Sequence, residues 1–250
     1  MSLGLEQHNI EILENRDLWE KKPLLRKVYS EFYRAITSRV NPAHPGLTVE
    51  LGSGMGNIKQ HIPQCITTDI FPNPWLDRVE NAYHLSFGQG EVANLILFDV
   101  WHHLRYPGTA LKEFARVLAP EGRIILFEPA MGLIGRFVFG HFHHEPLGLK
   151  DEIEFNAPDA FSELEPTYYA AQGNASRVFG SATFKDALRP WRITEIKYFP
   201  GLAYVASGGF RGPQLYPEKL LPLVNLIDSA FSRFPKLASR MLVVLERDGP

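Results

Sequence analysis

The chain has 250 residues, of which 45% are hydrophobic, so one α/β domain with insertions fits and a second domain has little room. Its 26 basic and 28 acidic residues leave a net charge of -2, without the dense basic block that a nucleic-acid partner requires. Cys65 is the only cysteine, which excludes an intrachain disulfide. No signal-peptide pattern and no apolar run of about 18 residues occurs, so we expect a cytoplasmic protein without an integral membrane segment.

The first predicted element is an amphipathic helix over residues 23–39. Its apolar side chains recur at three- and four-residue steps: Leu24, Leu25, Val28, Tyr29, Phe32, Tyr33 and Ile36. Its other face carries the charged residues Arg26, Lys27, Glu31 and Arg34. This spacing predicts packing of one face against a sheet, and contact with a ligand is the alternative use of that face.

Residues 47–57 run from an apolar strand into three alternating glycines, Gly52, Gly54 and Gly56. The dinucleotide fingerprint requires its third glycine one position later, where this chain has Asn57. A nucleotide-dependent oxidoreductase is therefore the more remote interpretation. The carboxylate of Glu50, just before the glycines, would repel a diphosphate but suits a ligand that carries cationic groups.

Strand-like and helix-like segments alternate from residue 47 to residue 128, which predicts a parallel sheet with helices on both faces. After the first strand and a helix, we expect strands at residues 65–69, 94–99 and 123–128 and a helix at 108–118. A long irregular stretch at 130–190 follows, then a strand at 191–199, a helix at 217–234 and a strand at 239–246. Four acids fall at expected strand ends, where ligands of such sheets bind: Glu50, Asp69, Asp99 and Glu128.

Residues 47–129 resemble the class I S-adenosylmethionine-dependent methyltransferases, in particular the small-molecule, methyltransferase type 11-like branch. The resemblance rests on four ordered blocks: the glycine loop, the strand ending in Asp69, residues 81–87, and residues 94–122. It implies a doubly wound, seven-stranded, mostly parallel sheet, the Rossmann-like methyltransferase fold, with the last strand antiparallel between the fifth and sixth. It also implies one domain over residues 1–250, with an N-terminal helical lid at 1–40 and a substrate-side insertion at 130–190.

The resemblance implies S-adenosyl-L-methionine as the cofactor. The residues expected to bind it are Glu50, Gly52, Ser53, Gly54, Gly56, Asp69, Ile70, Asn81, Ala82, Phe98 and Asp99. Asp69 corresponds to the acid that holds the ribose hydroxyls. Asn81 stands where the family usually has Asp on the adenine side, and its amide oxygen still accepts a hydrogen bond.

The acceptor is expected to be a small molecule or a lipid- or sugar-like compound, whose identity, like the oligomeric state, the sequence does not define. Candidate catalytic residues are Tyr29 on the lid, His103 after the fourth strand and His144 in the insertion. A structural role for the pair His102 and His103 is an alternative. The run 141–145 contains imidazoles and a carboxylate, but its spacing is not that of a metal site, and none is predicted. A non-catalytic cofactor-binding module is the alternative function.

Overall fold

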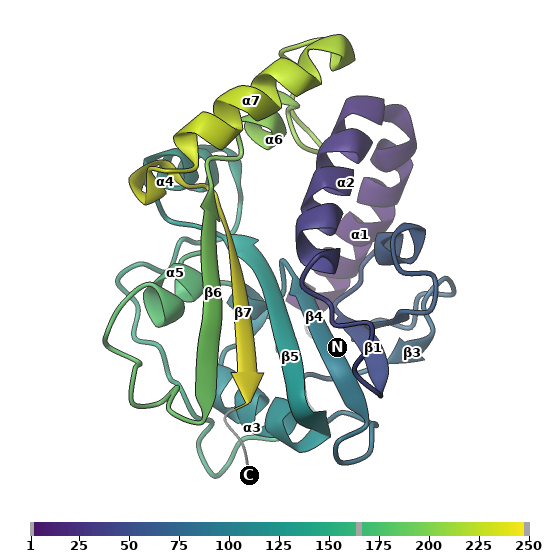
Figure 1. Cartoon of the computed structure of the whole chain (residues 1–250), viewed down its shortest axis with the longest axis vertical. Coiled ribbons are helices and arrows are strands. Elements are labelled where there is room, and N and C mark those ends of the chain that lie inside the picture. The colour runs from purple at the N-terminus through teal and green to yellow at the C-terminus, as the bar shows by residue number, and fades with distance from the viewer. Residues whose placement is uncertain (1–2, 164–166, 248–250) are drawn as a thin grey trace.

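The computed structural model describes residues 3–163 and 167–247, which form one seven-stranded sheet (Figure 1). The strand order is β3-β2-β1-β4-β5-β7-β6. The strands are β1 (Leu47–Leu51), β2 (Ile66–Asp69), β3 (Arg78–Val79), β4 (Val92–Phe98), β5 (Leu118–Pro129), β6 (Trp191–Phe199) and β7 (Arg240–Arg247). β7 pairs antiparallel with both β5 and β6, and the remaining neighbours pair parallel. The predicted fold class and the position of the last strand are confirmed.

Helices and short 3-10 turns connect these strands and cover both faces of the sheet. The helices are α1 (Leu3–Lys21), α2 (Pro23–Thr37), α3 (Pro107–Val117), α4 (Leu133–Phe142), α5 (Asn174–Phe179), α6 (Leu202–Ala206) and α7 (Leu221–Phe231). The 3-10 turns are η1 (Asn57–Gln60), η2 (Trp101–His103), η3 (Glu218–Leu220) and η4 (Pro235–Leu237). None of the helices in the described part of the chain is long and apolar enough to cross a membrane.

Alternating side chains of β4 show how the sheet separates two cores. Leu95 and Leu97 belong to the core on the α3 face, whereas Ile96 and Phe98 belong to the core on the α2 face. Successive strand residues point to opposite faces, so an all-apolar strand such as β4 is buried on both. The predicted apolar face of residues 23–39 is the buried face of α2.

Three elements differ from their predicted form. The helix expected after the first strand is only the short turn η1, because Gly56 enters it in the left-handed conformation and Pro63 follows closely. β5 begins at Leu118, ahead of the expected start at residue 123. The helix expected at 217–234 is divided into η3 and the shorter α7.

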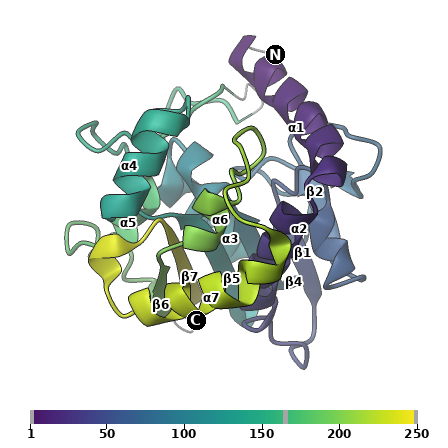
Figure 2. The ribbon, with the colours of Figure 1, turned by 90° about the horizontal axis from the view of Figure 1, so that it is seen from above.

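Figure 2 looks down on the edge where the parallel strands end, with α1, α4, α6 and α7 arranged around it. Glu50, Asp69 and Glu128 lie at or next to the ends of their strands, and Asp99 directly follows β4. The four acids that the sequence assigns to one edge of the sheet therefore meet there.

Candidate functional site

Two glycines of the loop after β1 serve different purposes. Both have positive φ, 63° at Gly52 and 51° at Gly54, which favours glycine. A Cβ at Gly52 would lie 2.4 Å from Cγ2 of Val100, so the packing of the fold requires a glycine there. A Cβ at Gly54 would meet no atom of the described chain within 4 Å. Gly54 therefore faces open space, and that space is a pocket.

The pocket has a volume of about 320 Å³ and lies at the carboxyl edge of the sheet. It is lined by nearly all residues expected to bind the cofactor: Glu50, Gly52, Ser53, Gly54, Asp69, Ile70, Asn81, Ala82, Phe98 and Asp99. Gly56 is not in the lining, since it lies against Trp75 and Leu76. The residues that the sequence assigns to cofactor binding thus form one wall of this pocket.

Glu50 supplies a buried carboxyl group to this wall. Its side chain is 1% exposed, and its Oε2 has no hydrogen-bond partner within the described chain. Burial raises the pKa of Glu50 to about 8. A buried carboxylate without a partner is costly, so the wall is complementary to a ligand that brings positive charge. The sulfonium and ammonium groups of S-adenosylmethionine fit this requirement.

The other polar groups of this wall are held by the backbone. Asp69 Oδ2 accepts a hydrogen bond from Gly54 N at 2.9 Å, which fastens the glycine loop to the end of β2. Asn81 Oδ1 accepts from Tyr83 N at 3.1 Å, and its Nδ2 donates to Glu163 O at 2.6 Å. These contacts fix the side chains in place at the pocket, whereas their roles toward ribose and adenine remain predictions.

A buried ion pair braces the end of β4. Asp99 adopts a left-handed conformation with φ of 57°, and its Oδ1 accepts a hydrogen bond from Arg240 Nη1 at the start of β7. Arg240 is 2% exposed and lies over the ring of Tyr204. Arg240 was not among the predicted site residues, because no local sequence pattern shows that an arginine at the start of a strand pairs with a residue far away in the chain.

The two adjacent histidines after β4 have different environments. His102 is 3% exposed, and its Nδ1 lies 2.7 Å from Glu128 Oε2. The other oxygen of Glu128 accepts from the backbone N–H groups of Val100 and Trp101. Burial opposes charge on His102, but the carboxylates of Glu128 and Glu145 raise its pKa to about 10. His102 is thus a fixed cation that ties η2 to β5.

His103 faces the pocket instead. Its Nδ1 lies 2.9 Å from Tyr169 O, and a carbonyl only accepts, so Nδ1 carries the proton and Nε2 carries the lone pair. Burial, together with the neighbouring charge of His102, lowers the pKa of His103 to about 3. Its Nε2 lies 3.7 Å from Glu145 Oε1. A neutral imidazole therefore points its basic nitrogen at a carboxylate.

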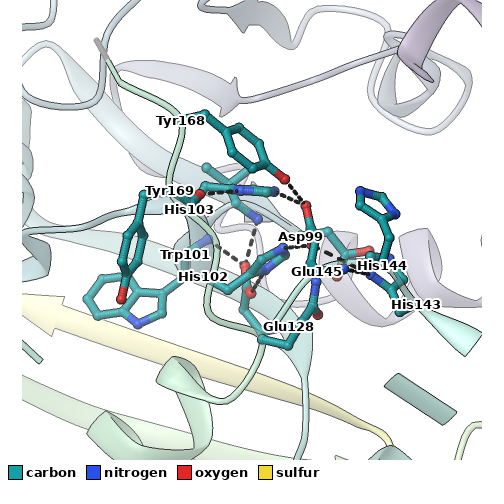
Figure 3. Close-up of polar contacts among 12 residues, drawn as sticks. Asp99, Trp101, His102, His103, Glu128, His143, His144, Glu145, Tyr168 and Tyr169 are labelled. Atoms are coloured by element: carbon teal, nitrogen blue, oxygen red, sulfur yellow. Dashed lines mark hydrogen bonds and ion pairs between the residues drawn. The ribbon is translucent and has the colours of Figure 1, made fainter. Parts of the chain in front are cut away.

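Glu145 is the centre of the polar network around His102 and His103 (Figure 3). Its Oε1 accepts a hydrogen bond from Tyr168 Oη at 2.5 Å, and its Oε2 accepts from Gln172 Nε2. Although burial opposes ionisation, His102, His103 and Tyr168 hold the pKa of Glu145 below its usual range. Glu145 was among the candidate bases in the run 141–145, but its burial and its contacts with Tyr168 and Gln172 were not predicted.

The remaining two catalytic candidates are placed differently. Tyr29 lines the pocket and stacks on Phe98 with ring centroids 5.6 Å apart. Burial raises its pKa well above the usual value, so its hydroxyl stays protonated. The side chain of His144 is 56% exposed, and its Nε2 lies 3.5 Å from Glu11 Oε2. His144 is absent from the lining of this pocket.

The geometry offers two groups of side chains with atoms close enough to hold a metal ion. Asp99, His102 and Glu128 form one, but Glu128 is already used by His102 and two backbone N–H groups. His8, His103 and Glu145 form the other, with one atom of each within 4.8 Å of the others. The sequence-based expectation of no metal site remains a prediction.

Comparisons with known proteins agree with this geometry. Residues 49–126 match the family model described as a methyltransferase domain. None of the curated proteins matches the chain.

Three solved structures share the fold. A chain in the complex that contains the Haloferax volcanii Trm112 methyltransferase activator is 14% identical, with a TM-score of 0.54 over 100% of this chain and 99% of that one. A possible histamine N-methyltransferase from Thermotoga maritima is 12% identical, with a TM-score of 0.54 over 95% and 99%. Geranyl diphosphate C-methyltransferase from Streptomyces coelicolor is 12% identical, with a TM-score of 0.52 over 88% and 76%.

The sheet order, the glycine loop and the family match define the class of protein. Residues 49–126 carry a methyltransferase domain, and S-adenosylmethionine, the cofactor that the resemblance implies, fits the buried carboxyl group and the open glycine loop of the pocket. When bound, this cofactor supplies a methyl group on a sulfonium, which is transferred by in-line displacement.

Proposed function

We propose that the protein methylates an oxygen or nitrogen atom of a small, largely apolar or lipid-like acceptor that binds in the pocket beside His103, whose imidazole lies against the buried Glu145. The acceptors in the names of the similar structures include histamine and geranyl diphosphate, so the fold leaves the acceptor open. Support for an apolar body comes from the apolar and aromatic side chains that line the rest of the pocket wall. That wall contains Ile12, Tyr83, Leu104, Tyr106, Phe161, Tyr168, Tyr169 and Phe210.

One observation carries the choice of oxygen or nitrogen. His103 Nε2 and Glu145 Oε1 are both hydrogen-bond acceptors, they lie 3.7 Å apart, and neither donates to the other. Two acceptors this close together are favourable when one donor lies beside them, within hydrogen-bond distance of both. A hydroxyl or an amine N–H of the acceptor molecule supplies that donor, whereas a carbon acceptor does not.

His103 and Glu145 would then share the work of removing the proton. As the acceptor atom forms its bond to the methyl carbon, its proton becomes strongly acidic and moves to Nε2 of His103 despite the low pKa of that imidazole, and the sulfur keeps the electron pair of the broken carbon–sulfur bond. The fixed Nδ1–H bond to Tyr169 O holds the imidazole in the required tautomer. The ionised Glu145 would stabilise the imidazolium as it forms.

Transfer is tested with tritium-labelled S-adenosylmethionine and an organic extract of the source cells. Label that enters the organic phase is identified by mass spectrometry, and the purified acceptor is then used for kinetics. His103→Ala should reduce kcat by about 100- to 10,000-fold, the usual contribution of a general base. Its affinity for S-adenosylhomocysteine should stay within about threefold, under 1 kcal/mol.

His44→Ala is the matched control, because His44 lies outside the pocket lining and bonds only to backbone carbonyls. Glu145→Gln keeps the shape of the carboxylate and should lower kcat while the pH dependence of kcat changes. A chelator should leave transfer unchanged if no metal takes part. Full activity of His103→Ala would contradict the proposed base, and cofactor binding without any labelled product would favour the non-catalytic module.

A further inference from the structure

The outer face of α7 is an uncovered apolar surface. Along α7 and its two flanking turns, large apolar side chains point away from the protein: Leu220, Leu223, Leu226, Ile227, Phe231 and Phe234. Leu226, at its centre, is 67% exposed. The inner face is fixed, because Asp228 accepts hydrogen bonds from Leu202 N and Ala203 N at the start of α6. These hydrogen bonds therefore keep the apolar face of α7 turned outward.

α4 extends this surface. It exposes Leu133, Phe137 and Phe142, and Phe142 is 75% exposed. α4 contacts η4, the turn that follows α7, and Figure 2 shows α4 beside the end of α7 at the rim of the molecule. We call the exposed apolar residues of α4 and α7, together with Leu220 and Phe234, the apolar rim. An uncovered surface of this kind marks an interaction site.

The charges around the apolar rim that lack an ion-pair partner have one sign. Lys219, Arg233 and Lys236 flank α7, and Arg136 lies on α4; all four are exposed. Within residues 3–163 and 167–247, these four cations have no carboxylate partner.

The two acids of the α7 region are already engaged. Glu218 pairs with Lys27 at 2.5 Å, and Asp228 faces inward to bond α6. The apolar rim therefore combines leucine and phenylalanine side chains with border cations that have no carboxylate partner. Such a surface is complementary to a lipid layer that has an apolar interior and anionic head groups.

We propose that the apolar rim docks on an anionic membrane surface, with α7 and α4 lying in the interface between head groups and acyl chains. Amphipathic interfacial helices combine Leu and Phe on one face with Lys and Arg at the border in this way. Protein interfaces, in contrast, are depleted of Lys. This docking requires no helix that crosses the membrane. α7 has only 11 residues, and none of the described helices is long and apolar enough to span a membrane.

One loop connects the pocket with this surface. Residues 207–217 form the loop between α6 and η3, and within it Phe210 lines the pocket whereas Leu215 is 70% exposed. Lys22 Nζ holds the loop by donating to the carbonyls of Gly209 and Gly212, both at 2.7 Å. A docked rim would therefore bring the acceptor side of the pocket close to the lipid layer.

Vesicle co-sedimentation tests this docking without any need for methyl transfer. The full chain should bind vesicles of phosphatidylcholine mixed with phosphatidylserine, and bind vesicles of phosphatidylcholine alone much more weakly. High salt should reduce the binding. The variant Lys219→Glu/Arg233→Glu/Lys236→Glu should lose at least about a hundredfold, since each cation beside an anionic membrane contributes about fivefold.

The charge control is Lys112→Glu/Lys150→Glu/Lys185→Glu, which removes the same charge from exposed lysines elsewhere and should retain most binding. The apolar variant Leu223→Ser/Leu226→Ser/Phe231→Ser should also lose binding, whereas Val79→Ser, at an equally exposed apolar residue on β3, should not. Unchanged melting temperature and cofactor affinity show that each variant is folded. Absence of vesicle binding, or a dimer in solution that the apolar variant dissociates, would overturn the proposal.

Discussion

The two sides of the pocket are built in different ways. The cofactor side uses residues 50–99, which lie at the ends of neighbouring parallel strands and are held largely by backbone contacts such as Gly54 N to Asp69. The acceptor side combines His8, His103 and Tyr168, which line the pocket, with Glu145, which lies behind His103 and Tyr168; the four residues come from four separate segments. The first side is a local pattern repeated along the sheet, whereas the second exists only once the whole chain has folded.

We therefore expect the two sides to control different steps, binding of the cofactor and selection of the acceptor. Changes on the cofactor side should act on affinity for S-adenosylmethionine, and changes on the acceptor side should act on transfer alone. Loops held by a rigid scaffold alter specificity without unfolding it, which gives the division a physical basis.

The largest effect is expected at Gly54. Gly54→Val should abolish measurable binding of S-adenosylhomocysteine, a loss of at least about a hundredfold or 2.7 kcal/mol, because the new side chain fills the open space that the ligand needs. Gly90→Val is the matched control: Gly90 also has positive φ, 69°, and open surroundings, but it lies outside the pocket lining. Calorimetry and thermal melting separate the two effects. Normal binding by Gly54→Val would show that the glycine only forms the turn.

A smaller loss of affinity is expected at the end of β2. Asp69→Ala should weaken cofactor binding by about ten- to a hundredfold, the range for one lost charge-assisted hydrogen bond of about 1.5 to 3 kcal/mol. Part of this loss would come from the glycine loop, which Asp69 also holds. Isothermal titration of a variant that keeps its cooperative melting transition measures the loss. Unchanged affinity would remove Asp69 from the cofactor side.

On the acceptor side, Tyr168→Phe removes the hydroxyl that donates to Glu145. We expect kcat to fall by about tenfold, the value of one lost hydrogen bond of about 1.4 kcal/mol to a charged group. Cofactor affinity should stay within about threefold. Tyr216→Phe is a suitable control, since its hydroxyl bonds Ala203 O outside the pocket lining. If Tyr168→Phe weakened cofactor binding and left kcat intact, the division between the two sides would be wrong.

The smallest effect is a pH dependence from Glu50. Burial raises its pKa from 4.5 to about 8, so the free protein holds a proton there at neutral pH, and its free energy of unfolding decreases as pH rises between these values. A cationic cofactor favours the carboxylate, so binding below pH 8 releases this proton, and affinity rises with pH by at most about tenfold per unit. Calorimetry in buffers of different ionisation enthalpy measures the release. Glu50→Gln should remove it, and equal release by both proteins would assign the proton to another group.

The sequence predicted the sheet well because its strands are strong apolar runs. Residues 191–199 are β6 as predicted, and the antiparallel β7 was expected from the resemblance. The site was predicted in part for the same reason: Glu50, Asp69 and Asp99 end or follow strands. The burial and the network of Glu145 were not predicted, because its partners lie in separate segments and a carboxylate in a histidine-rich run has no periodicity that shows its burial. The exposure of α7 was also hidden, since an apolar helix face looks the same in sequence whether it is covered or not.

The position of β7 also constrains how the chain folds. β7 lies between β5 and β6, and Arg240 at its start pairs with Asp99 beside the pocket. During synthesis, β5 and β6 have no partner for these edges until residues 240–247 have left the ribosome. Before that moment the nascent chain exposes two unpaired apolar edges, which invite aggregation and chaperone binding. Completion of the sheet and alignment of Asp99 are thus one late event in the folding of this protein.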